Sequence, residues 1–411
     1  MKTPVTFGIV FAACTTTVAD VIHVPTDQPT IQSAIDVATD GDSILIAPGT
    51  WREHLDPLGK AVEIRGDGTA AEVILESPDG GTMLTVASQE PETTIFADLT
   101  FTGGVDDAAV RIEDASPTFV RCLFRDNLRT AAADAGPCGQ ISGATFLDCL
   151  FLDNRAVNAG AIYVSHSNTT FDGCAFVGNE VSGQPSPYVS AGGAIYVNNW
   201  DCGINTFTIR ACDFIDNTAT WGGAMYAQGV FPSAATDLTI SDCRFIGNQA
   251  VEGRSMWLWY IDGDIAGSYF CGGGDQIHNG WGDAGGNVFV DDCTGAENDD
   301  CDGDRIPDAP AIAVGLAADC NADGLPDGCT SNDPKIDADG NGIPDVCETP
   351  PCIADLSGNG VVDGGDLGIW LALADNDCLS DPDCLADLND DGIIDGADIG
   401  VILGAWGACP N

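Results

Sequence analysis

Residues 149–164 read Cys-Leu-Phe-Leu-Asp-Asn-Arg-Ala-Val-Asn-Ala-Gly-Ala-Ile-Tyr-Val, and the repeats of this stretch predict the fold. Its first half is a unit, Cys-x-Phe-x-x-Asn, that occurs five times. The five copies begin at Cys122, Cys149, Cys174, Cys212 and Cys243. Successive copies are 25 to 38 residues apart, a spacing typical of solenoid proteins, in which each repeat forms one coil.

The second half of the stretch, Ala-Ile-Tyr-Val, recurs at 194–197, as Ala-Met-Tyr-Ala at 224–227 and as Ser-Met-Trp-Leu at 255–258. Glycines precede the first three of these units and favour tight corners. The Cys and Phe of the first unit are two residues apart and share one strand face. The residue between them varies, so we expect the other face to be solvent. The pattern predicts an all-β parallel solenoid of about ten coils over residues 40–293, stacked about 4.8 Å apart.

This region resembles the right-handed parallel β-helix, or pectin-lyase-like, superfamily over residues 21–293. The resemblance includes an N-terminal cap, because Ile31, Ile35 and Ala38 have helical spacing and the helix ends at Asp40-Gly41. Residues 42–49 then read as the first strand and turn. The resemblance implies the fold and leaves the activity open, since this fold hosts many functions.

Two columns of repeated polar residues are predicted to be structural. A disulfide needs Cβ atoms about 3.5–4.5 Å apart and side chains turned toward each other, which stacked cysteines do not offer. We therefore expect the five repeat cysteines to form a buried thiol ladder. The asparagines of the same units are expected to be bonded from coil to coil at a turn. They are Asn127, Asn154, Asn179, Asn217 and Asn248.

The aromatic residues of the second unit are predicted to form a column on the outer surface. The apolar residues on either side of each ring are expected to point inward. Such a column could stack on sugar rings, or it could simply stabilise the sheet as a cross-strand ladder. The candidate carbohydrate-binding residues are Tyr163, Tyr196, Tyr226, Trp257 and Trp259.

No catalytic residue is predicted. Polygalacturonase-like enzymes of this fold carry Gly-His-Gly and Arg-Ile-Lys signatures, which are absent here, and residues 61–293 contain no Lys. Arg244 and Asp213 occupy matching positions one coil apart, and we interpret them as a surface ion pair.

The charge of the chain is very uneven. It has 63 acidic and 14 basic side chains, for a net charge of −49. This excludes an electrostatic nucleic-acid binder and argues against an anionic membrane surface. Residues 294–411 hold 26 acidic and two basic residues, and 24 of those acids are Asp. A tail made for solubility would mix in Glu freely, so the bias indicates metal ligands.

Two loops near the C-terminus have the spacing of EF-hand-type calcium sites, with Gly at position 6. Each offers oxygens at positions 1, 3, 5, 9 and 12 and a backbone carbonyl at position 7. The predicted ligands of the first loop are Asp355, Ser357, Asn359, Val361, Asp363 and Asp366. Those of the second, 32 residues later, are Asp387, Asn389, Asp391, Ile393, Asp395 and Asp398. Apolar runs at 367–373 and 399–406 are predicted to be short helices.

Paired loop–helix repeats of this kind resemble dockerin type I modules over residues 355–407. The resemblance implies calcium as a cofactor and a cohesin-like or other surface protein as a partner for residues 351–411. Dockerins recognise cohesins through loop positions 10 and 11, which here are Gly364-Gly365 and Gly396-Ala397.

Three further Asp clusters lie between these regions and recur every 18–19 residues. They resemble thrombospondin type-3 repeats, in which calcium ions and disulfides replace a hydrophobic core. The implied ligands are Asp300, Asp302, Asp304 and Asp308; Asp319, Asn321, Asp323 and Asp327; and Asp337, Asp339, Asn341 and Asp345. A disordered acidic linker is the alternative, and the cysteine pairing is left open.

The N-terminus reads as a secretory signal with cleavage after Ala19, because Lys2 precedes an apolar stretch from Val5 to Ala13. A lipoprotein signal at Cys14 is the rival interpretation. The sequence contains no other run apolar enough to span a membrane. The predicted regions are a signal peptide (1–19), a β-helix (20–293), calcium repeats (294–350) and a dockerin-like pair (351–411).

These features together predict an exported, secreted or cell-surface, calcium-binding protein with a carbohydrate-associated role. That role is polysaccharide binding or association with polysaccharide degradation. A non-catalytic surface or structural protein is the alternative. A polysaccharide lyase or glycoside hydrolase is the third possibility.

Overall fold

The computed structural model describes residues 19–135, 143–182, 190–199, 205–229, 236–293, 299–330, 344, 354, 356–357, 361–374, 388 and 396–408. The chain divides into two compact units. The first contains Met1–Ala318 and Gly324–Pro326, and the second contains Asp319–Asp323 and Asp327–Asn411. The predictions for the signal peptide, Cys14 and the third Asp cluster lie outside the described residues.

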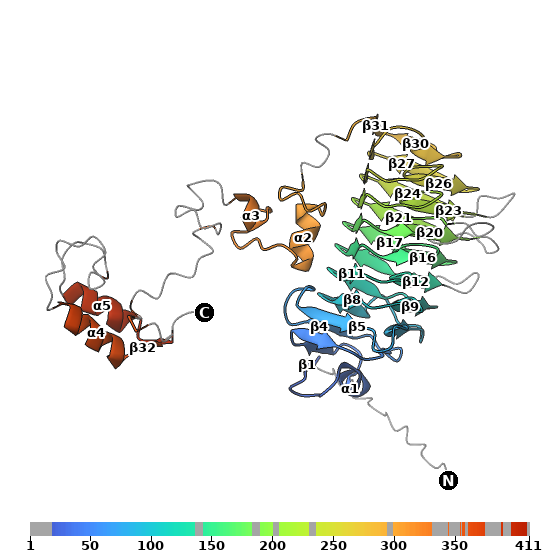
Figure 1. Ribbon diagram of the computed structural model, residues 1–411. Coiled ribbons are helices and arrows are strands. Elements are labelled where there is room, and N and C mark those ends of the chain that lie inside the picture. The colour runs from blue at the N-terminus through green and yellow to red at the C-terminus, as the bar shows by residue number, and fades with distance from the viewer. Residues whose placement is uncertain are drawn as a thin grey trace, which may run out of the picture. The chain divides into compact units, whose positions relative to one another are not determined.

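The first unit is a parallel β-helix whose coils are stacked along one axis (Figure 1). Each complete coil contributes one strand to each of three parallel sheets, A, B and C. Sheet A contains β1 (Val21–Val24), β2 (Ser43–Ile46), β4 (Glu63–Gly66), β7 (Ile95–Ala97), β10 (Thr118–Val120), β13 (Thr145–Leu147), β17 (Thr170–Asp172), β21 (Asn205–Arg210), β24 (Thr236–Ser241), β27 (Asp262–Ala266) and β30 (Gly282–Gly285).

From β2 onward, each strand of sheet A is followed after a sharp corner by a strand of sheet B, whereas β1 is followed by helix α1 (Ile31–Val37). The strands of sheet B are β3 (Gly49–Trp51), β5 (Val73–Glu76), β8 (Thr100–Thr102), β11 (Leu123–Arg125), β14 (Leu150–Leu152), β18 (Ala175–Val177), β22 (Asp213–Ile215), β25 (Arg244–Ile246), β28 (Tyr269–Cys271) and β31 (Val288–Val290). Its ten strands agree with the expected number of coils.

Sheet C closes the third side of the coil. It contains β6 (Leu84–Val86), β9 (Val110–Glu113), β12 (Ala132–Ala135), β16 (Ile162–Ser165), β20 (Ile195–Asn198), β23 (Met225–Gln228), β26 (Met256–Trp259) and β29 (Ile277–His278). A short pair, β15 (Arg155–Ala156) and β19 (Glu180–Val181), lies on the turn between sheets B and C.

The interior is a set of side-chain columns. Phenylalanines one coil apart on sheet B stack with ring centroids 4.7–4.9 Å apart, from Phe101 to Phe270. The asparagine ladder is confirmed, because each Asn side-chain N–H₂ from Asn127 to Asn217 donates to the next Asn side-chain oxygen at 2.9–3.0 Å. The thiol ladder is also confirmed, since all five repeat cysteines are buried and free.

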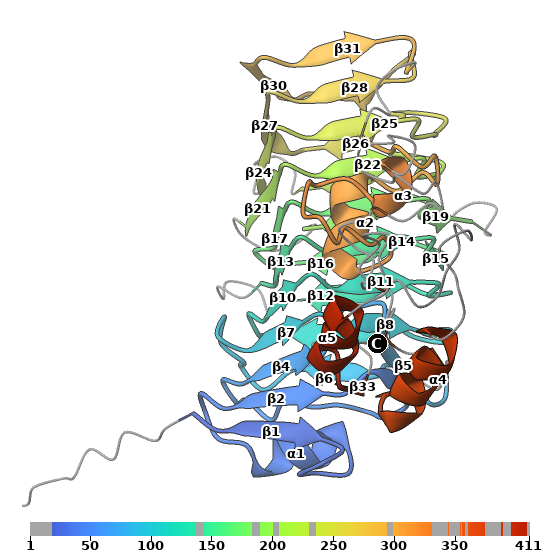
Figure 2. The same cartoon turned by 90° about the vertical axis from the view of Figure 1, so that its left-hand side faces the viewer.

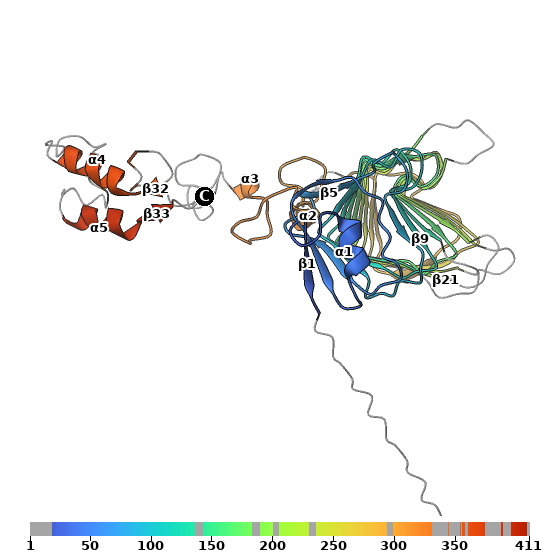
Figure 3. The same cartoon turned by 90° about the horizontal axis from the view of Figure 1, so that it is seen from below.

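A helix covers the N-terminal end of this core, as the sequence predicted. Helix α1 (Ile31–Val37) buries Ile31, Ala34 and Ile35, and Thr30 caps it by accepting from the backbone N–H of Ser33. Figure 3 shows α1 against the first coil. At the other end, a disulfide joins Cys271 to Cys293.

The segment after the β-helix returns to pack on it. Helix α2 (Asp308–Val314) lies over the outer face of sheet B (Figure 2). The second unit contains α3 (Asp327–Thr330), α4 (Gly364–Ala374) and α5 (Gly396–Gly404), with β32 (Val361–Val362) antiparallel to β33 (Gly407–Ala408). Its small core holds Ala354, Val362, Trp370, Leu388 and Ile402.

Candidate functional site

The first aspartate cluster forms a tight loop beside the β-helix. Asp300, Asp302 and Asp304 each offer a carboxylate oxygen, and these three oxygens lie within 4.8 Å of one another. Asp300 also accepts hydrogen bonds from the backbone N–H groups of Gly303, Asp304 and Arg305 at 2.8–3.1 Å. The backbone bonds thus hold three like charges close together, which is unfavourable unless a cation neutralises them.

Asp308 closes this loop at the first residue of α2. Its Oδ1 accepts from the backbone N–H of Cys301 at 3.1 Å. Its side chain is only 4% exposed, and Oδ2 is buried with no hydrogen-bond partner. Burial raises the pKa of Asp308, and the negative charges of Asp302 and Asp300 raise it further. A buried carboxylate oxygen without a partner is costly, and a bound cation would supply the partner.

These residues fit calcium. The side chains are oxygen donors of the hard type that Ca²⁺ prefers, and Ca²⁺ takes about six to eight of them in flexible geometry. The spacing of Asp300, Asp302, Asp304 and Asp308 is the one the sequence predicted. The structure therefore brings three of the four predicted ligands, Asp300, Asp302 and Asp304, together in one loop, and Asp308 follows as the first residue of α2.

The second aspartate cluster, in the second unit, repeats the same hydrogen bonds. The backbone N–H of Asp323 donates to Asp319 at 3.1 Å and to Asn321 at 3.0 Å. The backbone N–H of Cys320 donates to Asp327 at 3.0 Å. The same offsets relate Asp304 to Asp300 and Asp302, and Cys301 to Asp308. The two clusters are structural repeats.

The EF-hand-type loops are described only in part. Asp366 is buried and accepts from the backbone N–H groups of Ser357 at 2.9 Å and Asp363 at 2.8 Å. Hydrogen bonding from Asp363 holds the pKa of Asp366 below its usual value. Asp398 is also buried and accepts from Leu388 at 2.8 Å.

Val361 lies in β32, and the two predicted helices are confirmed as α4 and α5. The other predicted ligands of the two EF-hand-type loops lie outside the described residues. They are Asp355, Asn359, Asp387, Asn389, Asp391, Ile393 and Asp395.

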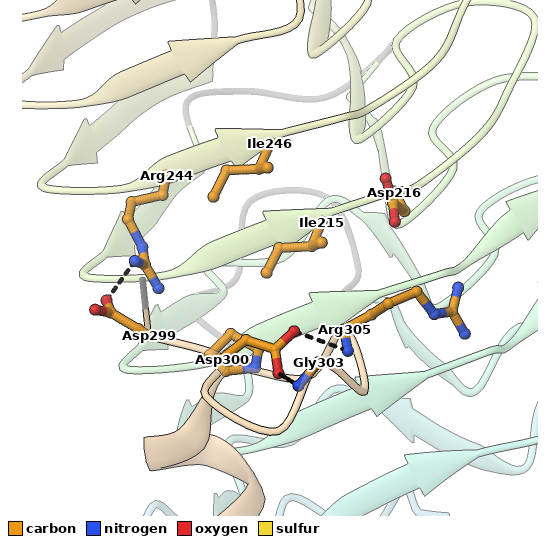
Figure 4. Close-up of a pocket in the computed structure, with 9 residues that line it drawn as sticks. Ile215, Asp216, Arg244, Ile246, Asp299, Asp300, Gly303 and Arg305 are labelled. Carbon is orange, nitrogen blue, oxygen red and sulfur yellow. Dashed lines mark hydrogen bonds and ion pairs between the residues drawn. The ribbon is translucent and has the colours of Figure 1, made fainter. Parts of the chain in front are cut away.

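A small pocket lies between the first Asp loop and sheet B (Figure 4). Its volume is about 180 Å³, and its floor contains Ile215 and Ile246. Arg244 stands on one side, where its guanidinium bonds Asp213 at 2.6 and 2.9 Å and also bonds Asp299 of the loop. The predicted Arg244–Asp213 pair is thus confirmed. The pocket is smaller than the roughly 300–1,000 Å³ typical of ligand sites, so we interpret it as a loosely packed seam.

One expectation about sheet B is wrong. The residues between Cys and Phe were expected to face solvent, but Leu123, Leu150 and Ala175 are fully buried. Ile306, Ala311 and Val314 pack against them in a second hydrophobic cluster that also contains Val177. The covering segment lies more than 100 residues later in the chain, so no local pattern revealed the contact. The apolar run at 311–314 inside an acidic stretch was the available signal.

The aromatic column lies on the outer face of sheet C, as predicted. Rings of neighbouring coils stack on one another, with centroids 4.7–5.5 Å apart along Tyr163, Tyr196, Tyr226 and Trp257. Burial raises the pKa of Tyr196 to about 12. Tyr226 is only 3% exposed, whereas Trp259 is 38% exposed. The stacked rings cover each other's faces, so Trp259 is the most accessible ring of the column.

A buried acid that the sequence did not reveal lies inside the β-helix. Asp134 of β12 accepts from the backbone N–H of Ala144 at 3.0 Å and from the hydroxyl of Thr169 at 2.8 Å. Its Oδ1 is buried without a hydrogen-bond partner. Burial raises the pKa of Asp134. It pairs in register with the inward-facing Ile112 and Val164, so alternation along the strand was the only signal of its burial.

Comparison with known proteins agrees with the fold. The sequence profile of the family described as "Right handed beta helix region" matches residues 85–278. No curated protein sequence matches the chain. Among the described residues, no helix is both long and apolar enough to cross a membrane.

Several solved structures are similar to the chain at low identity. Pectin methylesterase PemA from Erwinia chrysanthemi is 12% identical, with a TM-score of 0.43 over 71% of this chain and 99% of its own. The pectin methylesterase from carrot is 13% identical, with a TM-score of 0.44 over 68% and 90%. Pectate lyase Pel9A is 10% identical, with a TM-score of 0.40 over 66% and 80%.

Proposed function

We propose that this chain is an exported, calcium-binding β-helix protein with a carbohydrate-associated role. In this proposal residues 351–411 act as a dockerin-like module for docking or display. The observation that carries the calcium part is the loop of Asp300, Asp302 and Asp304, whose carboxylate oxygens converge within 4.8 Å, together with the buried, unpartnered oxygen of Asp308, the next predicted ligand along the chain.

Calcium would be held by the three convergent carboxylates with Asp308 beside them, and by the corresponding residues of the repeats that follow. Bound Ca²⁺ supplies positive charge and coordination that bring acidic side chains together. The disulfide between Cys271 and Cys293 supports export, because disulfides persist in oxidising compartments.

Calcium binding is tested on the full chain by isothermal titration calorimetry and by terbium luminescence. We expect the double variant Asp300→Asn/Asp302→Asn to lose one site relative to the parent. Asp237→Asn is the matched control, because Asp237 is an exposed aspartate on β24 outside every predicted calcium loop. Identical stoichiometry for the double variant and the parent would contradict a calcium site in this loop.

The carbohydrate role is proposed for the outer face of sheet C. Trp259 supports it, because this exposed ring lies next to Trp257, the last ring of the coil-to-coil stack, and two residues after it on β26. We expect Trp259→Ala to weaken retention on polysaccharides that the parent binds by about fivefold to tenfold, equivalent to about 1–1.4 kcal/mol. Leu316→Ala, an exposed apolar position away from sheet C, is the control. Equal retention of Trp259→Ala and the parent would contradict the proposal that the aromatic column is the carbohydrate-binding surface.

A non-catalytic surface or structural protein is the second candidate function. The mutual stacking of Tyr163, Tyr196, Tyr226 and Trp257 favours it, because rings that cover one another stabilise a sheet and leave little face for a sugar. A lyase or hydrolase activity is the third. Release of reducing ends or unsaturated products from a polysaccharide panel would favour that activity over both the carbohydrate-binding role and the structural role.

A further inference from the structure

Residues 299–317, which we call the clasp, connect the first Asp loop to a helix that is docked on the β-helix. We propose that the clasp is calcium-dependent: metal binding by the Asp loop holds α2 on sheet B, and loss of the metal releases α2 and uncovers an apolar patch. This patch contains Leu123, Leu150, Ala175 and Val177. The inference rests on the proposed calcium binding by Asp300, Asp302 and Asp304.

The contact between clasp and sheet is an apolar one. Ala311 and Val314 of α2 are buried on the patch, and Ile306 packs beside them. Helix α2 has only seven residues, too few for a helix that is stable by itself in water. It therefore depends on being held against sheet B, and whatever fixes its first turn controls whether it forms.

The Asp loop fixes that first turn. Asp308 is both the last acid of the loop and the first residue of α2, and its carboxylate accepts from the N–H of Cys301 at 3.1 Å. Asp304 accepts from the N–H of Ile306 at 2.7 Å, immediately before the apolar contact begins. The carboxylates available for a metal are thus the groups that position Ile306 and the start of α2.

Without a cation, the same loop opposes docking. Three carboxylates within 4.8 Å repel one another, and burial of Asp308 leaves an unpartnered oxygen. Docking α2 keeps Asp308 buried, so it maintains this unfavourable arrangement. Bound Ca²⁺ would reverse the sign of both effects, which couples occupancy of the loop to docking of the helix.

Other contacts also hold the loop end: the backbone N–H of Asp308 donates to the carbonyl of Asp299 at 2.6 Å, Cys301 is disulfide-bonded, and two ion pairs lie beside the loop. Arg244 of β25 bonds Asp299, and Arg305 lies 3.9 Å from Asp153. The pocket of about 180 Å³ beneath the loop shows that this end is loosely packed (Figure 4). The exposed Arg305–Asp153 pair contributes little, and none of these contacts removes the repulsion among the convergent carboxylates, which is the part a metal ion would supply.

The far end of the clasp is held by a close fit instead. The backbone N–H of Ala71 donates to the carbonyl of Val314 at 3.0 Å. Gly315 follows with a φ of +79°, and a Cβ at this position would lie 2.3 Å from the side chain of Thr69. A larger residue here would force the clasp off the sheet and would leave every carboxylate of the loop unchanged.

Hydrogen–deuterium exchange of the full chain tests the proposal, with peptides covering 306–317 and strands β11, β14 and β18. With calcium, we expect at least tenfold slower exchange of 306–317 than with chelator. Asp300→Asn/Asp302→Asn should exchange at the chelated rate in both conditions, and Asp237→Asn should behave as the parent. Gly315→Val should exchange fast even with calcium, and binding of the dye ANS should rise as the patch is exposed.

The outcomes separate the two proposals. If the double variant loses a calcium site but calcium leaves the exchange of 306–317 unchanged in the parent, the clasp is wrong and the calcium site stands. If the double variant loses no calcium site, the site in this loop is wrong and the clasp with it. Slow exchange of 306–317 in chelator would also overturn the clasp.

Discussion

The phenylalanine columns of the β-helix and the aspartate loops that follow it are both repeats. Contacts between the repeated side chains are favourable in the columns and unfavourable in the loops. Stacking one Phe on the next at 4.7 Å buries apolar area and stabilises each added coil. Bringing one Asp within 4.8 Å of the next costs energy. The first repeat needs no ligand to be stable, whereas the second, in our proposal, is stabilised by a bound cation. The predictions below test this difference, starting with the largest expected effect.

Removal of calcium should unfold the Asp loops and leave the β-helix folded. On the proposed calcium binding, chelation is expected to unfold residues 319–411 and to release 299–317, while the β-helix keeps its strands. Limited proteolysis followed by mass spectrometry, with far-ultraviolet circular dichroism, measures this. Cleavage patterns that do not respond to chelator would contradict the assignment of the loops as ligands.

Truncation of a core ring should affect only the β-helix. Phe151→Ala removes a fully buried side chain stacked on both neighbours, and we expect a loss of about 3–5 kcal/mol in the free energy of unfolding. Phe289→Ala is the control in the same column, because Phe289 is 48% exposed on the last coil, and its cost should be below about 1.5 kcal/mol. Urea unfolding followed by tryptophan fluorescence gives both values. Equal losses in the free energy of unfolding for the two variants would contradict the prediction that buried rings of the column stabilise the β-helix more than exposed ones.

Breaking the asparagine ladder should cost somewhat less. Asn179 accepts from Asn154 and donates to Asn217 and to the carbonyl of Phe151, all in the buried interior. Asn179→Ala leaves these groups unsatisfied, and we expect a loss of about 2–3 kcal/mol. The same change at Asn248, the last rung, removes fewer bonds and should cost less. An equal or larger cost at Asn248 would contradict a cooperative ladder.

Replacing the buried Asp134 should have the smallest effect on stability, and this effect should depend on pH. Its pKa in the folded protein is raised above 3.8, so the folded state binds more protons than the unfolded state above that pH. Its contribution therefore falls as pH rises through the raised pKa. Asp134→Asn should remove this slope, so the stability of the variant relative to the parent should rise as pH increases above 3.8. Melting temperatures at several pH values measure it, and a constant difference across pH would contradict it.

Sequence reasoning succeeded where the relevant contact is one coil away. Cys149, Phe151 and Asn154 each contact an identical residue in the next coil, so the repetition of these residues in the sequence predicts the contact. The parity of Tyr163 followed in the same way, from the apolar residues on either side of it. The corresponding reasoning failed at Leu150, because the residues that bury it come from a segment outside the repeat.

The parallel β-helix, its N-terminal cap, its internal ladders and the spacing of the Asp clusters could all be predicted from the sequence alone. All of these depend on contacts at a fixed sequence offset, which a periodic pattern records. That α2 covers the outer face of sheet B and that Asp308 is buried became clear only in the folded protein. The same is true of the aromatic rings, which cover one another's faces. Those features depend on long-range packing and on how much solvent a neighbour excludes, and neither leaves a period in the sequence.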